Sequence, residues 1–74
     1  MGKEKIETDV AKVLQRVIKK RKELRISQTE LALKLHLTPN GYFKIEKGHT
    51  GLSVIRVLEI AEALKVNPHC FFVD

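Results

Sequence analysis

The chain has 74 residues, of which 14 are Lys or Arg and 9 are Asp or Glu, so its formal net charge is +5. This length allows one domain with a modest core, and chains this small often bury more surface by pairing. No apolar run approaches the length of a membrane span and no hydrophobic signal segment follows the N-terminus, so neither a membrane nor a secreted protein is expected. Cys70 is the single cysteine, which excludes a disulfide framework within the chain and predicts a cytoplasmic protein.

The positive charge is concentrated in the first third of the chain. Residues 1–25 contain nine Lys/Arg and four Asp/Glu, residues 26–51 contain three and two, and residues 52–74 contain two and three. This asymmetry fits a molecule with one end facing a polyanion and the other facing a protein. A solvated helix face is the alternative explanation for much of the surplus.

The N-terminal region predicts a short tail followed by a helix. Residues 1–5 are expected to form a flexible, charged tail. A helix is then predicted from about Glu7 to Glu23, because apolar residues recur at helical spacing. These apolar residues are Ile6, Val10, Val13, Leu14, Val17 and Ile18.

Residues 27–48 predict two short helices joined by a tight turn. The first, over residues 28–35, begins with a capping box in which Ser27 and Glu30 each satisfy a free backbone N–H. Its apolar stripe is too short for a helix that stands alone, so it must pack against a neighbour.

The second helix of this pair is predicted over residues 39–47. Thr38 is its N-cap, Pro39 occupies its first position, and Gly48 is placed to end it in a left-handed conformation. Two faces follow from the spacing, and the inner one carries Tyr42 and Ile45. The outer face is a stripe of four residues at i, i+3, i+4 and i+7, which are Asn40, Phe43, Lys44 and Lys47.

Residues 53–73 are predicted to form a dimerisation region. Ser53 caps a helix that runs to about Leu64, and the apolar arc of this helix is wider than one side of a small core needs. Asn67 caps a last short turn before an apolar terminus, which would limit solubility if it stayed exposed. We therefore predict a twofold interface formed by Leu52, Ile55, Phe71 and Phe72. The alternative is that the two phenylalanines fold back on a monomer core.

Taken together, these motifs resemble the helix-turn-helix family of the phage repressors and Cro, which is widespread among bacterial and phage transcription regulators. The match runs over about residues 12–72 without a gap. The residues that carry it are Arg21, Leu24, Ser27-Gln28, Leu31-Ala32, Leu35, Thr38-Pro39, Ile45-Glu46, Gly48 and the run Ile60-Ala61-Glu62-Ala63-Leu64.

The resemblance implies a compact all-α domain of four to five helices, repressor-like, with the helix-turn-helix at its centre. It also implies that Arg21 pairs with Glu46, which would tie the N-terminal helix to the helix over residues 39–47, the recognition helix of the family. Gln28 is implied to touch the DNA backbone. The alternatives are that Arg21 is a solvated cation and Gln28 a plain helix-start residue. Arg25 and His36 stand where the family often has glycine, which predicts a somewhat different geometry for both turns.

The outer stripe supplies the predicted DNA contacts. Asn40 and Lys44 are predicted base contacts, because Asn pairs with an adenine edge and Lys donates to guanine O6 and N7. Phe43 is the third, since its ring could lie against thymine methyl groups; the alternative is a ring folded onto the edge of the domain. The predicted phosphate contacts are Gln28, Thr38, Lys47, His49 and Thr50.

The sequence thus predicts a dimeric transcription regulator, of repressor or controller type, that binds a near-palindromic operator in double-stranded DNA. No cofactor, metal or small-molecule ligand is expected. Catalysis is not expected either, because the chain has no C-x-x-C or H-x-x-x-H spacing and no glycine-rich phosphate loop. The alternative from another class is a protein-interaction module, such as an antitoxin that masks a partner protein, which the apolar C-terminal third would also serve.

Overall fold

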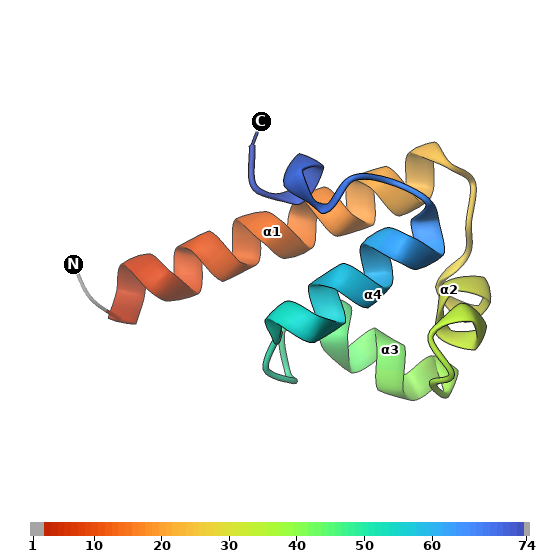
Figure 1. The fold of residues 1–74 in the computed structure, drawn as a ribbon. Helices are drawn as coiled ribbons and strands as arrows, with labels where there is room; N and C mark the ends of the chain where they lie inside the picture. The colour runs from red at the N-terminus through yellow and green to blue at the C-terminus, as the bar shows by residue number, and fades with distance from the viewer. Residues whose placement is uncertain (1–2, 74) are drawn as a thin grey trace.

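Residues 3–73 are described by the computed structural model, and among them the chain forms four α-helices, one 3-10 helix and no β-strand (Figure 1). The elements are α1 (Lys3–Glu23), α2 (Gln28–Lys34), α3 (Pro39–Glu46), α4 (Val54–Leu64) and the 3-10 helix η1 (Pro68–Phe71). The predicted all-α fold of four to five helices is confirmed.

The first helix starts earlier than the sequence predicts. It begins at Lys3 rather than near Glu7, so the flexible tail predicted for residues 1–5 is wrong for its last three residues, and its first two lie outside the described part. Lys and Glu are good helix formers, and Lys5 Nζ lies 4.0 Å from the Asp9 carboxylate one turn further on. The N-terminal half of α1 consequently projects beyond the rest of the molecule (Figure 1).

Local sequence fixes where the later elements begin. The Ser27 hydroxyl accepts from the N–H of Glu30 at 3.0 Å, and the Glu30 carboxylate accepts from the N–H of Ser27 at 3.1 Å, which completes the capping box. Side-chain oxygens of Thr38, Ser53 and Asn67 accept in the same way at the starts of α3, α4 and η1. All four predicted caps are confirmed.

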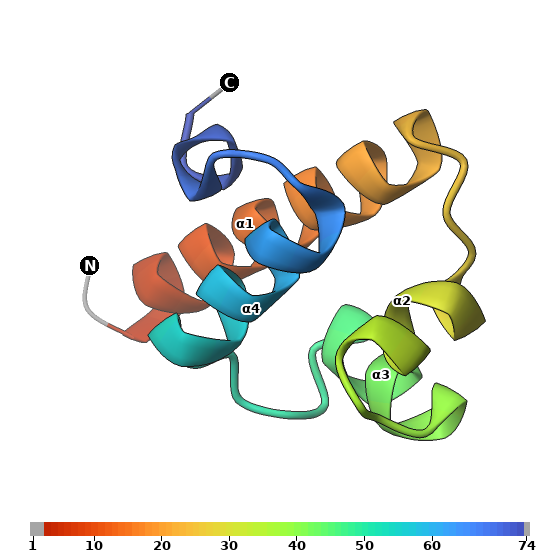
Figure 2. The same ribbon diagram turned by 45° about the vertical axis from the view of Figure 1, so that its right-hand side comes forward.

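The core lies where α1, α4 and η1 meet the α2–α3 pair (Figure 2). Every element places one apolar stripe there, so none of the short helices has to be stable by itself. The side chain of Ile6, predicted on this stripe of α1, lies outside the described residues. The buried apolar residues of the described part are Val13, Leu14, Val17, Leu31, Ala32, Leu35, Tyr42, Ile45, Val57, Ile60, Ala61, Leu64 and Phe71.

Phe71 corrects a sequence-based prediction. Its ring has no exposed surface, because η1 packs against both α1 and α4 and directs this side chain between them. The prediction that Phe71 forms a dimer interface is therefore wrong, and the alternative of a ring folded back on the core applies to it. The next residue, Phe72, points the other way and is 57% exposed.

Three non-glycine residues of the described chain have left-handed backbone: Arg25 (φ 59°), His36 (φ 59°) and Lys65 (φ 58°). We expected Arg25 and His36 to change the geometry of their turns, since glycine is more usual there. Instead each side chain is accommodated in the conformation that a glycine would adopt, at a steric cost of roughly 1–2 kcal/mol per residue. Gly48, by contrast, has the predicted left-handed conformation, with φ 75°.

We expect His36→Gly to stabilise the protein by about 0.5–1 kcal/mol, because relief of the left-handed strain exceeds the extra chain entropy that glycine gives the unfolded state. The His36 side chain is exposed and forms no hydrogen bond with another described residue, so little else is lost. Urea denaturation of both proteins measures the difference.

A matched glycine substitution separates strain relief from a general effect of glycine. Lys34→Gly changes an exposed residue in the last turn of α2, where the backbone is right-handed, and should destabilise by about 1 kcal/mol. A His36→Gly protein that unfolds at lower urea than wild type would contradict the argument.

Candidate nucleic-acid interface

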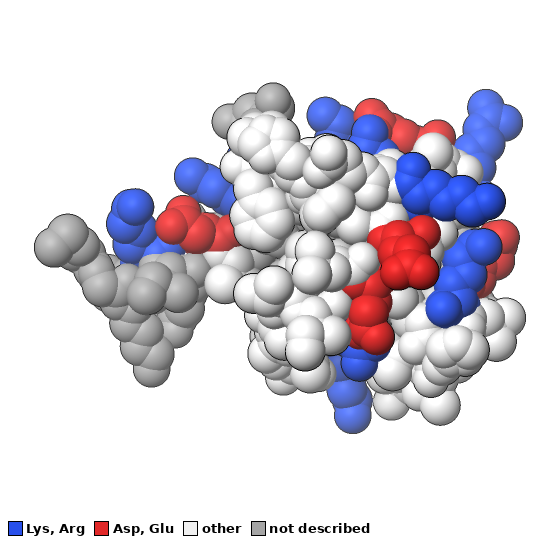
Figure 3. All heavy atoms as spheres, viewed as in Figure 1, with Lys and Arg blue, Asp and Glu red and all other residues white. Residues whose placement is uncertain are grey.

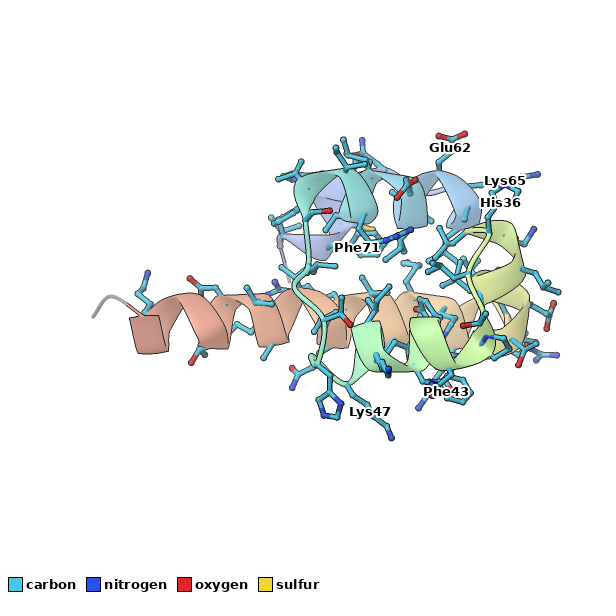
Figure 4. All side chains as sticks on the ribbon, turned by 90° about the horizontal axis from the view of Figure 1, so that it is seen from below. His36, Phe43, Lys47, Glu62, Lys65 and Phe71 are labelled. Atoms are coloured by element: carbon cyan, nitrogen blue, oxygen red, sulfur yellow. The ribbon has the colours of Figure 1, made fainter. Side chains whose placement is uncertain are left out.

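The α2–turn–α3 unit forms one corner of the molecule. The turn between the two helices is closed by backbone bonds from His36 N to Leu33 O at 3.1 Å and from Leu37 N to Ala32 O at 2.9 Å. Leu31 and Ala32 of α2 are fully buried against Tyr42 of α3, which fixes the angle between the two helices. The opposite side of α3 faces outward, and Figure 4 shows Phe43 and Lys47 pointing away from the body of the molecule.

The outward face of α3 carries the predicted stripe. Asn40, Lys44 and Lys47 are exposed, whereas Phe43 is half-buried. Phe43 therefore partly fits both of its predicted roles. Part of the ring packs on the edge of the domain, and the rest is exposed, where it could lie against thymine methyl groups. One amide and two ammonium groups remain fully available on a rigid, outward-facing surface.

Three further predicted contacts flank the recognition helix. Thr38, His49 and Thr50 are all exposed, the first before α3 and the other two in the loop after it. The Thr38 oxygen already accepts from Gly41 N at 3.1 Å, which leaves the hydroxyl hydrogen available to donate. A Cβ added at Gly41 would lie 3.1 Å from that same oxygen, so glycine here keeps space for the cap.

Behind α3 lies a buried polar cluster centred on Glu46. The Glu46 carboxylate receives two bonds from Arg21, from Nε at 2.8 Å and from Nη2 at 3.2 Å, and both side chains are buried. The third guanidinium nitrogen, Nη1, donates to the carbonyl of Ile26 at 2.9 Å. The Arg21–Glu46 pair that the resemblance implies is thus present, and it joins α1 to α3.

Two further donors complete the cluster. The Tyr42 hydroxyl donates to Glu46 Oε2, and Gln28 Nε2 donates to Glu46 Oε1 at 2.8 Å. Burial alone would raise the pKa of Glu46, but the hydrogen bonds from Arg21, Tyr42 and Gln28 outweigh it and hold this pKa below its usual range. Burial raises the pKa of Tyr42, and so does the neighbouring carboxylate, which keeps the hydroxyl protonated as a donor.

The bond from Gln28 was not foreseen from the sequence, which assigned this residue to the DNA backbone alone. Tyr42 was likewise assigned only to the core. The four-residue spacing of Tyr42 and Glu46 within one helix was a signal for their contact. The contact of Gln28 with Glu46, from α2 to α3, had no such local signal.

A second surface of interest lies on α4. Of its predicted residues, Ile55 and Phe72 are exposed and Leu52 is half-buried. Val54 and Leu58 lie within the predicted dimerisation region but were not among its four named interface residues; they are 75% and 50% exposed and share the outer side of α4 with Ile55. We call Val54, Ile55, Leu58 and Phe72 the α4 apolar surface, and Figure 3 shows on this side of the molecule a broad area without charged atoms, bordered by acidic and basic side chains.

The α4 apolar surface continues into a shallow hollow of about 260 Å³ between α1 and the start of α4. The hollow is lined mainly by apolar side chains, which include Val10, Val13, Val57 and Phe72. No cluster of three potential metal-binding side chains occurs among the described residues. Within the same part of the chain, no helix is both long and apolar enough to cross a membrane.

Comparison with known proteins agrees with this geometry. The sequence pattern of the helix-turn-helix family matches residues 17–69, more than half of the chain. Among solved structures, the restriction-modification controller protein C.AhdI from Aeromonas hydrophila superposes with a TM-score of 0.78 at 29% sequence identity, covering 88% of this chain and 98% of that chain. None of the curated protein sequences compared with this chain matches it. This chain belongs to the XRE-type helix-turn-helix family and is a DNA-binding transcription regulator rather than an enzyme.

Proposed function

We propose that this protein acts in the cytoplasm as a dimeric regulator of the controller type, which binds a near-palindromic operator in double-stranded DNA. The observation that carries the proposal is the outward stripe of α3, where Asn40, Lys44 and Lys47 are exposed while the same helix is anchored from behind by Tyr42 and Glu46. A rigid helix with such a face fits the major groove, whose base edges offer acceptors to these donors.

The controller role is supported by the likeness to C.AhdI, which extends over 98% of that chain. That protein is a restriction-modification controller, so this chain is proposed to regulate restriction-modification genes. In this proposal, Asn40, Phe43 and Lys44 contact bases. The proposed phosphate contacts are Gln28, Thr38, Lys47, His49 and Thr50.

Dimerisation is proposed through the α4 apolar surface together with Leu52. Val54 and Ile55 are 75% and 71% exposed, and neighbouring apolar side chains left in water favour association. A twofold axis through this surface would present two α3 helices on one side of the dimer. The corresponding half-sites would lie about one turn of B-DNA, roughly 34 Å, apart.

Selection of binding sites from a pool of random DNA duplexes tests the proposed function. The expected result is an enriched site with twofold symmetry and half-site centres about one helical turn apart. Enrichment of an asymmetric site would overturn the dimeric mode of binding, and failure to enrich any site would overturn sequence-specific recognition.

On the selected operator, we expect Lys44→Ala to weaken binding by about 1–3 kcal/mol while affecting mixed-sequence duplexes much less, because a base contact is lost. Lys44 is exposed and forms no ion pair with other described residues, so folding should be unaffected. Fluorescence anisotropy with both duplexes at one salt concentration measures the two losses.

Lys12→Ala is the matched control, since it removes the same charge from an exposed position on α1 away from the stripe. It should reduce both affinities slightly and to the same degree through the overall charge. If Lys44→Ala reduces the affinity for the operator and for mixed-sequence DNA equally, Lys44 does not contact a base.

A further inference from the structure

The Glu46 carboxylate is shared by three helices. Arg21 comes from α1, Gln28 from the first position of α2, and Tyr42 from the same helix as Glu46 itself. No buried side-chain nitrogen or oxygen of the described residues lacks a hydrogen-bond partner, so the cluster is fully satisfied. Three of its members are buried, and only Gln28 reaches the surface, where it is half-buried.

The chemistry of a carboxylate decides which way the Gln28 amide faces. An ionised carboxylate only accepts hydrogen bonds, so the amide must turn its nitrogen, and not its oxygen, toward Glu46. The nitrogen carries two hydrogens, and Glu46 takes one of them. No other bond of this amide occurs among the described residues, so its second N–H remains available on the partly exposed side. A freely rotating amide would present its oxygen to a phosphate about as often as its N–H. The amide oxygen and the phosphate oxygen are both acceptors, so they would repel.

We propose that Tyr42 is a positioning residue for DNA binding: through Glu46 it holds the Gln28 amide so that an N–H faces a DNA phosphate. This inference rests on the phosphate contact proposed above for Gln28. The Tyr42 side chain has no exposed surface and cannot touch DNA itself, so any effect it has on binding must pass through another group.

The geometry assigns separate tasks to the two oxygens of Glu46. Oε2 receives the Tyr42 hydroxyl and Arg21 Nε, whereas Oε1 receives Arg21 Nη2 and Gln28 Nε2. Tyr42 therefore adds to Arg21 in fixing the rotation of the carboxylate through Oε2, while Gln28 is held by Oε1. Removal of the hydroxyl leaves Arg21 as the one remaining donor to Oε2, and the oxygen that orients Gln28 becomes less firmly placed.

The test is a double-mutant cycle between Tyr42→Phe and Gln28→Ala, measured as affinity for a mixed-sequence DNA duplex at low salt. Tyr42→Phe keeps the buried ring and removes one hydrogen bond. It should weaken binding on the order of threefold when Gln28 is present. In the Gln28→Ala background it should have no further effect, because the group through which it acts is gone.

Ile45→Val is the control for a loss of stability alone. It alters a buried residue of the same helix that takes no part in the cluster, and its destabilisation should be about 0.5–1.5 kcal/mol. We expect it to change DNA affinity equally, if at all, in both backgrounds. Circular dichroism at the assay temperature confirms that each variant is folded.

The outcomes separate this inference from the proposed function. Tyr42→Phe could lower DNA affinity equally with Gln28 present and in the Gln28→Ala background, or in neither. Either result would overturn the positioning role, although the wild-type protein would still bind DNA. Unchanged affinity on Gln28→Ala would overturn it too, because the phosphate contact would be absent. Failure of the wild-type protein to bind any duplex would instead overturn the proposed function itself.

Discussion

Replacing Glu46 with alanine is expected to lower the free energy of unfolding by about 3–5 kcal/mol, since it leaves the buried Arg21 guanidinium without its counter-charge. Arg21 is only 7% exposed and cannot simply turn its charge into water. Tyr42 and Gln28 would lose their acceptor in the same step. The total free energy of unfolding of a small domain is about 5–15 kcal/mol, so this loss is a large part of it.

Urea denaturation of the variant measures this loss, and the Arg56–Glu59 pair supplies a control. Those two side chains approach to 3.2 Å on the surface of α4, with side-chain exposures of 29% and 49%. Glu59→Ala should cost less than about 1 kcal/mol, because a solvated pair contributes little. Equal losses for Glu46→Ala and Glu59→Ala would show that burial of the Arg21–Glu46 pair has no energetic consequence, contrary to the argument.

Replacing Ile55 with glutamate should convert the protein to monomers and weaken operator binding on the order of a hundredfold. Ile55 is 71% exposed, so the monomer fold should tolerate the charge, whereas a twofold interface would place two like charges close together. The affinity falls because the two half-sites would no longer be bound by linked subunits. Light scattering gives the mass, and anisotropy on the selected operator gives the affinity.

Leu33→Glu is the control for this experiment, because Leu33 is 68% exposed on α2 and lies outside the α4 apolar surface. Its mass should remain that of the wild type. Wild-type protein that is monomeric or aggregates by itself would contradict the homodimer. It would favour the alternative in which the α4 apolar surface covers a different protein, as in an antitoxin.

The starts of α2, α3, α4 and η1 and the outward stripe of α3 were predictable because local chemistry determines them. A capping side chain acts within three residues, so Ser27, Thr38, Ser53 and Asn67 could be identified without any tertiary information. Helical spacing likewise assigns Asn40 and Lys44 to one face. The Arg21–Glu46 pair was reached only through the family resemblance, because 25 residues separate its members.

Apart from the start of α1 and the turns at Arg25 and His36, the errors arose where a single residue had to be assigned to the inside or the outside of the molecule. Phe71 and Phe72 are adjacent and chemically identical, so composition could not say which one faces the core. The turn of η1 decides it, by directing Phe71 between α1 and α4. The bond of Gln28 to Glu46 depends on the packing angle between α2 and α3, which no local pattern contains.

The residues of α3 that face outward are different from those that anchor the helix to the core, and this affects how such a regulator could acquire a new DNA target. Asn40 and Lys44 are exposed and form no hydrogen bond or ion pair with other described side chains, so exchanges there should alter stability by no more than about 0.5 kcal/mol. Gly41, between them, is constrained by the Thr38 cap 3.1 Å from its missing Cβ. Positions 40 and 44 can therefore change independently of folding, whereas a side chain at position 41 would require the Thr38 hydroxyl to shift by a few tenths of an ångström.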